Sequence, residues 1–291
     1  MHITILGPGA VGSLWATKLK LAGHSVALWS RESESSLELS PDEQTPVLFD
    51  NNNSEKLKNC DLLLVTVKAW QVKDALAKVL PQLNQDTILV FMHNGMGAVD
   101  DISAELANYP VLLATTTHGA FKPNKHSIHH TGQGATQIGA YNCKGEQCRF
   151  LVEVLNHALP KVEWADNIQT ALWNKLAINC AINPLTAIEQ CRNGDLADSH
   201  FESIISAVLH EIHQVLSAEY VPLSQQELND RVYQVIRATA QNYSSMRQDI
   251  ANKRRTEIDF ITGHLIRTAK MHGIAVPNNL ALYEQIKRLE K

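Results

Sequence analysis

The feature that most constrains the fold is a glycine-rich turn near the start of the chain. It has the spacing G-x-G-x-x-G, at Gly7-Pro8-Gly9-Ala10-Val11-Gly12. The turn leaves the apolar run 2–6 and opens an apolar-periodic stretch over residues 10–21, which predicts a strand–turn–helix unit. Glycines let this backbone turn tightly and approach a pyrophosphate, which the free N–H groups of the helix start then bind. We therefore expect the chain to bind a dinucleotide.

Short apolar runs alternate with helical patterns through the first half of the chain. The runs cover residues 25–30, 61–67, 87–92 and 111–117. This alternation predicts βαβ units and a parallel sheet with helices on both faces. Residues 119–145 predict an antiparallel extension of that sheet, and a helix over 147–159 and a strand over 162–165 close this half.

Long helical patterns replace the strands from about residue 168. Residues 171–188 and 201–220 predict helices, and Ser224 with Glu227 forms a capping box for the next one. Thr256 and Asp259 predict a similar cap for a helix that ends at 272–273. We expect two domains: a dinucleotide-binding domain over 1–166 and a helical, substrate-binding and catalytic domain over 167–291.

Composition excludes several classes of protein. The 291 residues include 26 Lys and Arg against 30 Asp and Glu, a formal charge of −4, which argues against a nucleic-acid partner. The longest apolar stretches fall short of the ~18–20 residues of a membrane span, and the N-terminus lacks the basic region of a signal peptide. The odd number of cysteines, 5, predicts reduced thiols. We expect a cytoplasmic protein without a membrane anchor or a bound metal.

The end of the second predicted strand bears on which nicotinamide cofactor binds. An acidic residue there would bind the ribose 2′-hydroxyl and repel a 2′-phosphate. Arg31 stands at this point, and its planar donor fork suits a phosphate, so NADP(H) is favoured over NAD(H). Two observations leave NAD(H) open as an alternative. An arginine after a strand is often an ordinary surface residue, and Glu32 follows Arg31 directly.

Three polar residues share one face of the apolar helix predicted over 171–188. Lys175, Asn179 and Asn183 are spaced four residues apart and so drift only slowly around the helix. Polar groups on a buried helix are costly unless they meet partners, and a bound polyol or carboxylate in a cleft between the domains would supply them. The alternatives are a hydrogen-bond network without chemistry, or a lysine that reaches solvent.

Other polar residues are less specific. Lys68 and the loop 94–97 follow predicted strands at the edge where ligands gather in doubly wound sheets. His210 and His213 lack the spacing of a zinc-binding H-E-x-x-H motif, and we interpret them, like residues 129–130, as surface histidines. The chain contains no G-x-S-x-G elbow of a serine hydrolase.

Over essentially its whole length the chain resembles the 2-dehydropantoate 2-reductase (ketopantoate reductase) family. The segments that carry the resemblance are ITILGPGAVGSLWA, DLLLVTVKAWQV, HNGMG, TTTHGA, LWNKLAINCAINPLTAI, CRNGDL, SSMRQDI, TEIDFITG and HGIAVPNN. The resemblance implies a Rossmann domain followed by an all-helical domain like that of 6-phosphogluconate dehydrogenase. It also implies NADPH-dependent reduction of 2-dehydropantoate to (R)-pantoate, a step in pantothenate and coenzyme A biosynthesis.

The resemblance implies a role for individual residues as well. Lys175 matches the family's proton donor, and Glu257 matches a carboxylate close to both ligands. The cofactor-binding positions are Gly7, Pro8, Gly9, Ala10, Val11, Gly12, Arg31, Lys68, Gln71, Asn94, Ala120 and Glu257. The substrate-binding positions are Asn94, Lys175, Asn179, Asn183, Asn193 and Ser245.

This reading predicts an enzyme in which NADPH gives a hydride to the ketone carbon while Lys175 stabilises and protonates the oxygen. Two alternatives stay open. One is an NADPH-binding sensor without turnover. Such a sensor would need the glycine turn but not Glu257 or the polar residues Lys175, Asn179 and Asn183. The other is a related NADP-dependent 2-hydroxyacid reductase. The sequence is compatible with a monomer or a homodimer.

Overall fold

The computed structural model describes residues 1–42 and 45–290 and divides into two compact units. The first unit comprises Met1–His93 and Ala98–Ala171, and the second comprises Asn94–Gly97 and Leu172–Lys291. The loop Asn94–Gly97 therefore belongs by its contacts to the second unit, although it follows a strand of the first.

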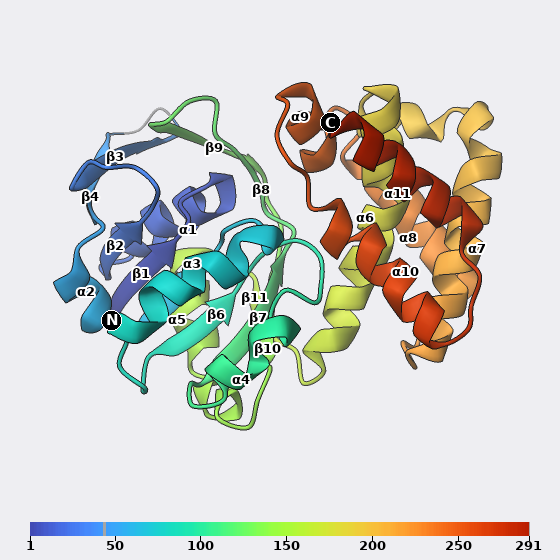
Figure 1. The fold of residues 1–291 in the computed structure, drawn as a ribbon. Coiled ribbons are helices and arrows are strands. Elements are labelled where there is room, and N and C mark those ends of the chain that lie inside the picture. The colour runs from blue at the N-terminus through green and yellow to red at the C-terminus, as the bar shows by residue number, and fades with distance from the viewer. Residues whose placement is uncertain (43–44, 291) are drawn as a thin grey trace. The chain divides into compact units, whose positions relative to one another are not determined.

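A long sheet forms the centre of the first unit (Figure 1). Its strands are β1 (His2–Leu6), β2 (Ser25–Trp29), β3 (Ser36–Pro41), β4 (Val47–Asn51), β5 (Leu62–Val65), β6 (Ile88–Phe91), β7 (Val111–Thr116), β8 (Gly119–Phe121), β9 (Ser127–Gly132), β10 (Thr136–Ala140) and β11 (Val162–Trp164). They lie in the order β11-β10-β7-β6-β5-β1-β2-β4-β3-β9-β8. The run from β4 to β7 through β1 is parallel throughout and has the doubly wound order of dinucleotide-binding folds. The predicted fold class of this half is confirmed.

Helices cover the central strands because both faces of those strands are apolar. The helices of this unit are α1 (Ala10–Leu21), α2 (Ser54–Lys58), α3 (Val72–Val79), α4 (Ser103–Leu106) and α5 (Leu151–Ala158). Ile3 and Ile5 pack in one core with Trp15 of α1 and Leu155 of α5. Alternate side chains point to opposite faces of a strand, and Leu63, which points away from this core, is also fully buried.

The β8–β9 hairpin extends the sheet at its far edge. β9 pairs in parallel with the end of β3, and both strands of the hairpin contact α1. β10 pairs antiparallel with β7, as the sequence predicts for residues 119–145. The antiparallel pair β3–β4, by contrast, lies in a stretch whose sequence pattern predicts no element.

The glycine turn packs closely against the end of β5. Gly7 has a φ of +85°, and a Cβ at this position would collide with Val67. A Cβ on Gly12 would collide with the hydroxyl of Thr66 and lie 2.7 Å from the carbonyl oxygen of Gly7. The Thr66 hydroxyl donates to that same carbonyl at 2.8 Å. This contact sets the path of the chain from β1 into α1.

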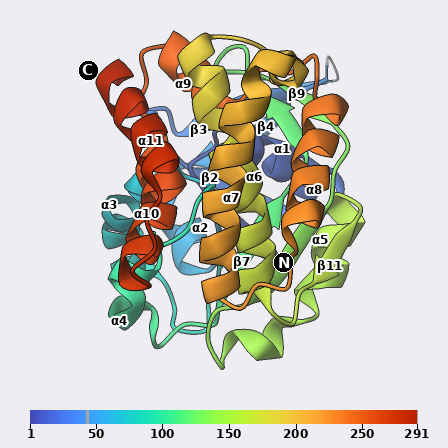
Figure 2. The same cartoon turned by 90° about the vertical axis from the view of Figure 1, so that its right-hand side faces the viewer.

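The second unit is helical. Its helices are α6 (Ile168–Glu189), which begins at the end of the first unit, α7 (Glu202–Ala218), α8 (Gln225–Ala238), α9 (Ser245–Ala251), α10 (Thr262–Met271) and α11 (Pro277–Leu289). α7 contacts α8 on one side and α10 and α11 on the other (Figure 2). The capping box at the start of α8 forms as predicted, since the Ser224 hydroxyl accepts from the Glu227 N–H at 3.2 Å and the Glu227 carboxylate accepts from the Ser224 N–H at 2.9 Å.

The capping box predicted at Thr256 is only half formed, and the prediction that it opens the long helix is wrong. Thr256 donates its hydroxyl and its N–H to the carboxylate of Glu290, each at 2.7 Å, while Asp259 accepts from the hydroxyl of Tyr283 at 2.8 Å. A short 3₁₀ turn, Ile258–Phe260, follows instead, and α10 begins at Thr262. The Thr256 hydroxyl still accepts from the Ile258 N–H at 3.1 Å, but the reciprocal bond of the Thr256 N–H to Asp259 is replaced by its bond to Glu290.

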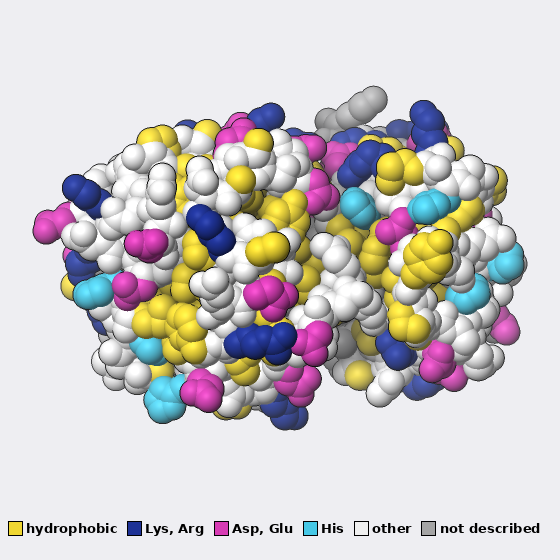
Figure 3. Space-filling view, turned by 90° about the horizontal axis from the view of Figure 1, so that it is seen from below, with side chains coloured by type: hydrophobic (Ala, Val, Ile, Leu, Met, Phe, Trp, Pro, Cys, Tyr) yellow, Lys and Arg dark blue, Asp and Glu magenta, His cyan; other side chains and the backbone are white. Residues whose placement is uncertain are grey.

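The surface mixes charges of both signs. Figure 3 shows acidic and basic side chains interspersed on the face it presents. Among the residues that the structure describes, no helix combines the length and hydropathy needed to cross a bilayer. The same residues contain no cluster of three or more His, Cys, Asp or Glu side chains placed to hold a metal ion, and all five cysteines are free.

The glycine turn yields a prediction about stability. Gly12→Ala should lower the free energy of unfolding of the ligand-free protein by about 1–3 kcal/mol, because the added methyl has no room beside Thr66. Gly9→Ala is the matched control, because a Cβ there meets nothing within 4 Å. Chemical denaturation of the two variants checks this. Equal stability of both would show that close packing does not shape the turn.

Candidate functional site

The glycine turn offers a place for an anion. Gly9 is the N-cap of α1 and makes no side-chain cap, and the first turn of that helix holds no acidic residue. The helix start therefore presents backbone N–H groups and the positive end of the helix dipole. Beside Gly9 the described residues leave open space where a Cβ would stand. Together these features fit the diphosphate of a dinucleotide.

Arg31 lies at the end of β2, next to the turn. The N–H of Gly7 donates to the carbonyl of Trp29 at 2.9 Å, which brings the two segments together. Asn52 holds the segment that carries Arg31, because it accepts from the Ser30 N–H at 2.9 Å and donates to the Glu32 carbonyl at 2.7 Å. Arg31 itself is exposed. Its guanidinium thus stands on a fixed backbone at the surface.

Lys68 and Gln71 lie beyond the end of β5. The Lys68 N–H donates to the side-chain oxygen of Gln71 at 3.1 Å, and the Gln71 N–H donates to the Lys68 carbonyl at 2.8 Å. Gln71 therefore shapes this turn through its oxygen. Ala120 lies in β8, whose strand contacts α1. All of the cofactor positions predicted in the first unit are thus on its glycine turn, on strand ends next to it, or on the hairpin along α1.

Asn94 and Glu257 meet inside the second unit. The Asn94 side-chain amide donates to the Glu257 carboxylate at 3.3 Å, and the Met96 N–H donates to the Phe260 carbonyl at 2.8 Å. Gly95 has a φ of +84°, and a Cβ there would collide with the Phe260 carbonyl. Close backbone approach therefore fixes Asn94 beside a carboxylate that is only 4% exposed.

Lys175 lies on α6 among apolar neighbours. Burial lowers the pKa of its ammonium to about 8, and the negative charge of Glu257 raises it against this effect. The two residues therefore interact electrostatically. A lysine whose pKa lies near neutrality can hold a proton at pH 7 and still release it readily, which is what a general acid requires.

The remaining predicted substrate positions extend from α6 toward the α8–α9 connection. Asn179 is partly buried and Asn183 is buried. Asn193 donates its side-chain amide to the Thr239 hydroxyl at 2.9 Å, and its own side-chain oxygen is buried. Ser245 is the first residue of α9 and is exposed. Its neighbour Ser244 accepts from the Thr186 hydroxyl at 2.8 Å, which ties α9 to α6.

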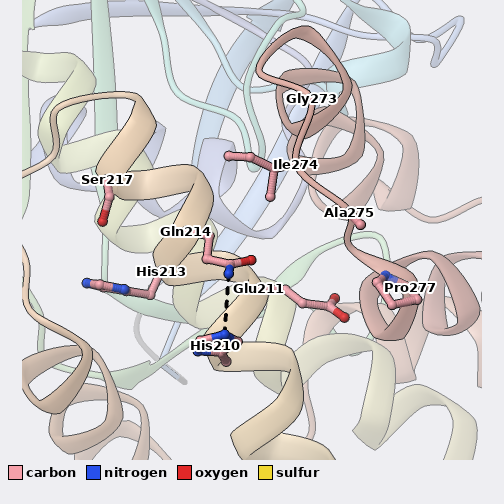
Figure 4. Close-up of a pocket in the computed structure, with 9 residues that line it drawn as sticks. All are labelled: His210, Glu211, His213, Gln214, Ser217, Gly273, Ile274, Ala275 and Pro277. Atoms are coloured by element: carbon pink, nitrogen blue, oxygen red, sulfur yellow. Dashed lines mark hydrogen bonds between the residues drawn. The ribbon is translucent and has the colours of Figure 1, made fainter.

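A separate hollow lies between α7 and the segment that leads into α11 (Figure 4). It is an open depression with a volume of about 840 Å³, and its lining includes His210 and His213. Glu211 accepts from the N–H groups of Asn278 and Asn279 at 2.8 and 2.9 Å and so caps α11. No residue of the predicted site lines this hollow. The carboxylate of Glu211 has a structural role as the cap of α11.

One residue that no sequence pattern indicates lies against the glycine turn. Lys122 follows β8, and its ammonium donates to the Pro8 carbonyl at 3.0 Å and to the Ser13 hydroxyl at 3.2 Å. Burial lowers the pKa of Lys122, and the charge of Glu32 raises it. No local pattern marks this lysine, because the contact depends on how the hairpin docks on α1.

Family models match both halves of the chain. Residues 3–142 match the ketopantoate reductase PanE/ApbA model, and residues 167–290 match the model of its C-terminal domain. The chain belongs to the ketopantoate reductase family. The 2-dehydropantoate 2-reductase of Vibrio cholerae is 56% identical over 291 residues, covering 100% of this chain and 98% of that protein. The enzyme of the same name from Escherichia coli O157:H7 is 42% identical over 294 residues, covering 100% and 95%.

Solved structures agree with this family. A PanE/ApbA family ketopantoate reductase from Ralstonia eutropha is 27% identical, with a TM-score of 0.88 over 99% of this chain and 98% of that one. D-mandelate dehydrogenase, solved with NADH and anilino(oxo)acetate, has a TM-score of 0.89 at 24% identity over 99% and 98%, and shares the fold. The predicted combination of a doubly wound sheet and a helical C-terminal domain is confirmed.

In this member of the ketopantoate reductase family, Glu257→Gln should lower the pKa of Lys175 below about 8, because the carboxylate that favours the charged ammonium is removed. NMR titration of the lysine Cε and Nζ resonances checks this, with the Lys175 signals assigned by their loss in Lys175→Arg. Glu189→Gln, which removes an exposed carboxylate at the end of α6, should leave the midpoint unchanged. An unchanged midpoint in Glu257→Gln would mean that the two residues do not interact.

Proposed function

We propose that the protein reduces 2-dehydropantoate to (R)-pantoate with NADPH, as a cytoplasmic enzyme of pantothenate and coenzyme A biosynthesis. The observation that carries the proposal is Lys175, a partly buried lysine with a pKa of about 8 beside the carboxylate of Glu257. Relatives that cover nearly the full chain bear the name 2-dehydropantoate 2-reductase. We assign cofactor binding to residues 1–166, and substrate binding and catalysis to residues 167–291, in a protein that acts as a monomer or a homodimer.

Bound NADPH supplies the hydride. Negative charge then grows on the ketone oxygen, and Lys175 stabilises that charge and donates its proton to the oxygen. Its lowered pKa supports this role, because an acid with a pKa near the working pH is protonated and transfers its proton with little cost. An ammonium in a partly desolvated position also stabilises an oxyanion more strongly than one in water.

Glu257 favours the protonated form of Lys175, which is the form that acts as the acid. Without this negative charge, burial would lower the pKa of Lys175 further and reduce the fraction of protonated ammonium. Asn94 donates to Glu257 and so holds the carboxylate in place. We assign Asn94 contacts with both ligands, and Glu257 contacts with the cofactor besides its effect on Lys175.

The amide and hydroxyl groups near Lys175 orient the substrate. Asn179 and Asn183 follow Lys175 at successive turns of α6, and a carboxylate and a hydroxyl are the groups that their amides bind well. Asn193 and Ser245 complete the set in our proposal. Fixing the ketone in one orientation is what makes the reaction stereospecific and contributes much of the rate.

NADPH is the proposed cofactor because of Arg31. An arginine at the end of β2 can bind a 2′-phosphate with two parallel N–H donors. The side chain of Asn52 forms hydrogen bonds to the backbone of Ser30 and Glu32, and these bonds hold the segment that carries this arginine. Gly7–Gly12, Lys68, Gln71 and Ala120 complete the proposed cofactor site.

The direct test of the reaction is an assay of the purified protein. It should oxidise NADPH when 2-dehydropantoate is added and should not do so with pyruvate. Absence of turnover with both, together with tight NADPH binding, would favour a sensor. Comparable turnover of pyruvate would instead favour a broader 2-hydroxyacid reductase.

Lys175→Ala should lower kcat about 10²–10⁴-fold, since this is the usual contribution of a positioned general acid. The Kd for NADPH, measured by fluorescence titration, should change less than threefold. Lys270→Ala, which removes an exposed lysine from α10, serves as the control and should keep full activity. Near-normal turnover of Lys175→Ala would remove this lysine from the acid role.

Arg31→Ala should raise the Kd for NADPH about tenfold or more while the Kd for NADH changes little. The expected loss corresponds to ~1.5–3 kcal/mol for hydrogen bonds to a charged group. Both constants can be measured by fluorescence titration at the same ionic strength. Equal effects on the two cofactors would defeat the assignment of Arg31 to the 2′-phosphate.

A further inference from the structure

Glu32 presents a difficulty for a protein that binds NADPH. It directly follows Arg31, at the end of β2 where an acidic side chain usually binds the ribose 2′-hydroxyl and repels a 2′-phosphate. Glu34 adds a second negative charge to the same segment. A dianionic phosphate next to Arg31 would meet both carboxylates unless something holds or neutralises them.

The turn between β8 and β9 supplies the counter-charge. The ammonium of Lys125 lies 2.8 Å from the carboxylate of Glu32 and 2.6 Å from that of Glu34. These contacts raise the pKa of Lys125 and lower that of Glu34, which favours the charged form of both groups. One lysine thus binds both acidic side chains that follow Arg31.

We propose that Lys125 is a specificity-determining residue for the cofactor: it holds Glu32 and Glu34 in ion pairs and so permits a 2′-phosphorylated dinucleotide to bind beside Arg31. This inference rests on the proposed use of NADPH. Lys125 acts on the cofactor through the two carboxylates and is therefore a positioning residue.

The backbone on both sides of these ion pairs is fixed. Asn124 closes the hairpin turn by accepting from the N–H groups of His126 and Ser127 at 2.9 and 2.8 Å. On the other side, Asn51 donates its side-chain amide to the carbonyl of Glu34 at 2.7 Å. The ammonium and the carboxylates are therefore presented to each other by ordered turns.

Lys122 connects the same turn to the diphosphate site. Its ammonium bonds to the Pro8 carbonyl at 3.0 Å and to the Ser13 hydroxyl at 3.2 Å, which seats the hairpin on the glycine turn. Two lysines of one turn thus contact the two segments of the first unit that we expect to bind phosphates. This arrangement makes the hairpin part of the cofactor site.

The ion pairs of Lys125 contribute little to folding. The side chains of Lys125, Glu32 and Glu34 are 40%, 45% and 50% exposed, and pairs this exposed have a small effect on stability. We therefore expect Lys125→Ala to fold normally, with an unchanged Tm. Any change in cofactor binding can then be assigned to charge.

The test measures equilibrium Kd values for NADPH and NADH by fluorescence titration, without turnover. Lys125→Ala should raise the Kd for NADPH about three- to tenfold and leave that for NADH unchanged or lower, as expected for uncovering charges near the surface. The triple variant Lys125→Ala/Glu32→Gln/Glu34→Gln should recover the NADPH affinity of the parent. In 1 M KCl, where the screening length falls to ~3 Å, the difference between parent and Lys125→Ala should largely disappear.

Lys144→Ala is the matched control, because it removes another exposed lysine of the first unit, one that bonds to the carbonyl of Asn108. It should leave both Kd values unchanged. The inference fails if Lys125→Ala keeps the parent's preference, or if the triple variant stays as weak as the single one. Equal affinity of the parent protein for NADPH and NADH would overturn the NADPH proposal itself and is distinguishable from either result.

Discussion

The pairing of a partly desolvated ammonium with a buried carboxylate is the interaction on which the chemistry we propose for this protein depends. Burial lowers the pKa of Lys175, and the charge of Glu257 opposes that effect and leaves the pKa at about 8. Glu257 owes its position to the loop Asn94–Gly97, which packs on the 3₁₀ turn Ile258–Phe260. The positive φ of Gly95 and the backbone contact of this loop thus help to set the acidity of Lys175 on α6.

In the first unit, the close approach of the glycine turn to the end of β5 determines the structure of the proposed cofactor site. The glycine turn lies against Thr66 and Val67 because no side chain stands between them, and the open space beside Gly9 remains for an anion. The β8–β9 hairpin adds charge to this frame, since Lys122 contacts the turn and Lys125 contacts the acidic residues after Arg31. In our proposal, cofactor preference is a property of several segments and not of Arg31 alone.

Much of this architecture could be predicted from local patterns, because strand runs, the glycine turn and the cap at Ser224 depend on neighbouring residues. The pairing of β3 with β9 and the bond between Asn94 and Glu257, residues 163 positions apart, depend on tertiary packing and leave no local signal. Thr256 shows how packing overrides a pattern: its capping motif is present, but Glu290 accepts from the Thr256 N–H in place of Asp259. The polar column on α6 suggested a ligand, yet spacing could not reveal the pKa of Lys175.

The most direct test of the central claim is the pH dependence of kcat/KM for the reduction of 2-dehydropantoate, which reports ionisations of the free enzyme and substrate. If protonated Lys175 is the acid, kcat/KM is constant below its pKa and falls about tenfold per pH unit above about 8. Glu257→Gln should move this break to lower pH. A profile that stays flat to pH 10 in the parent enzyme would contradict the account.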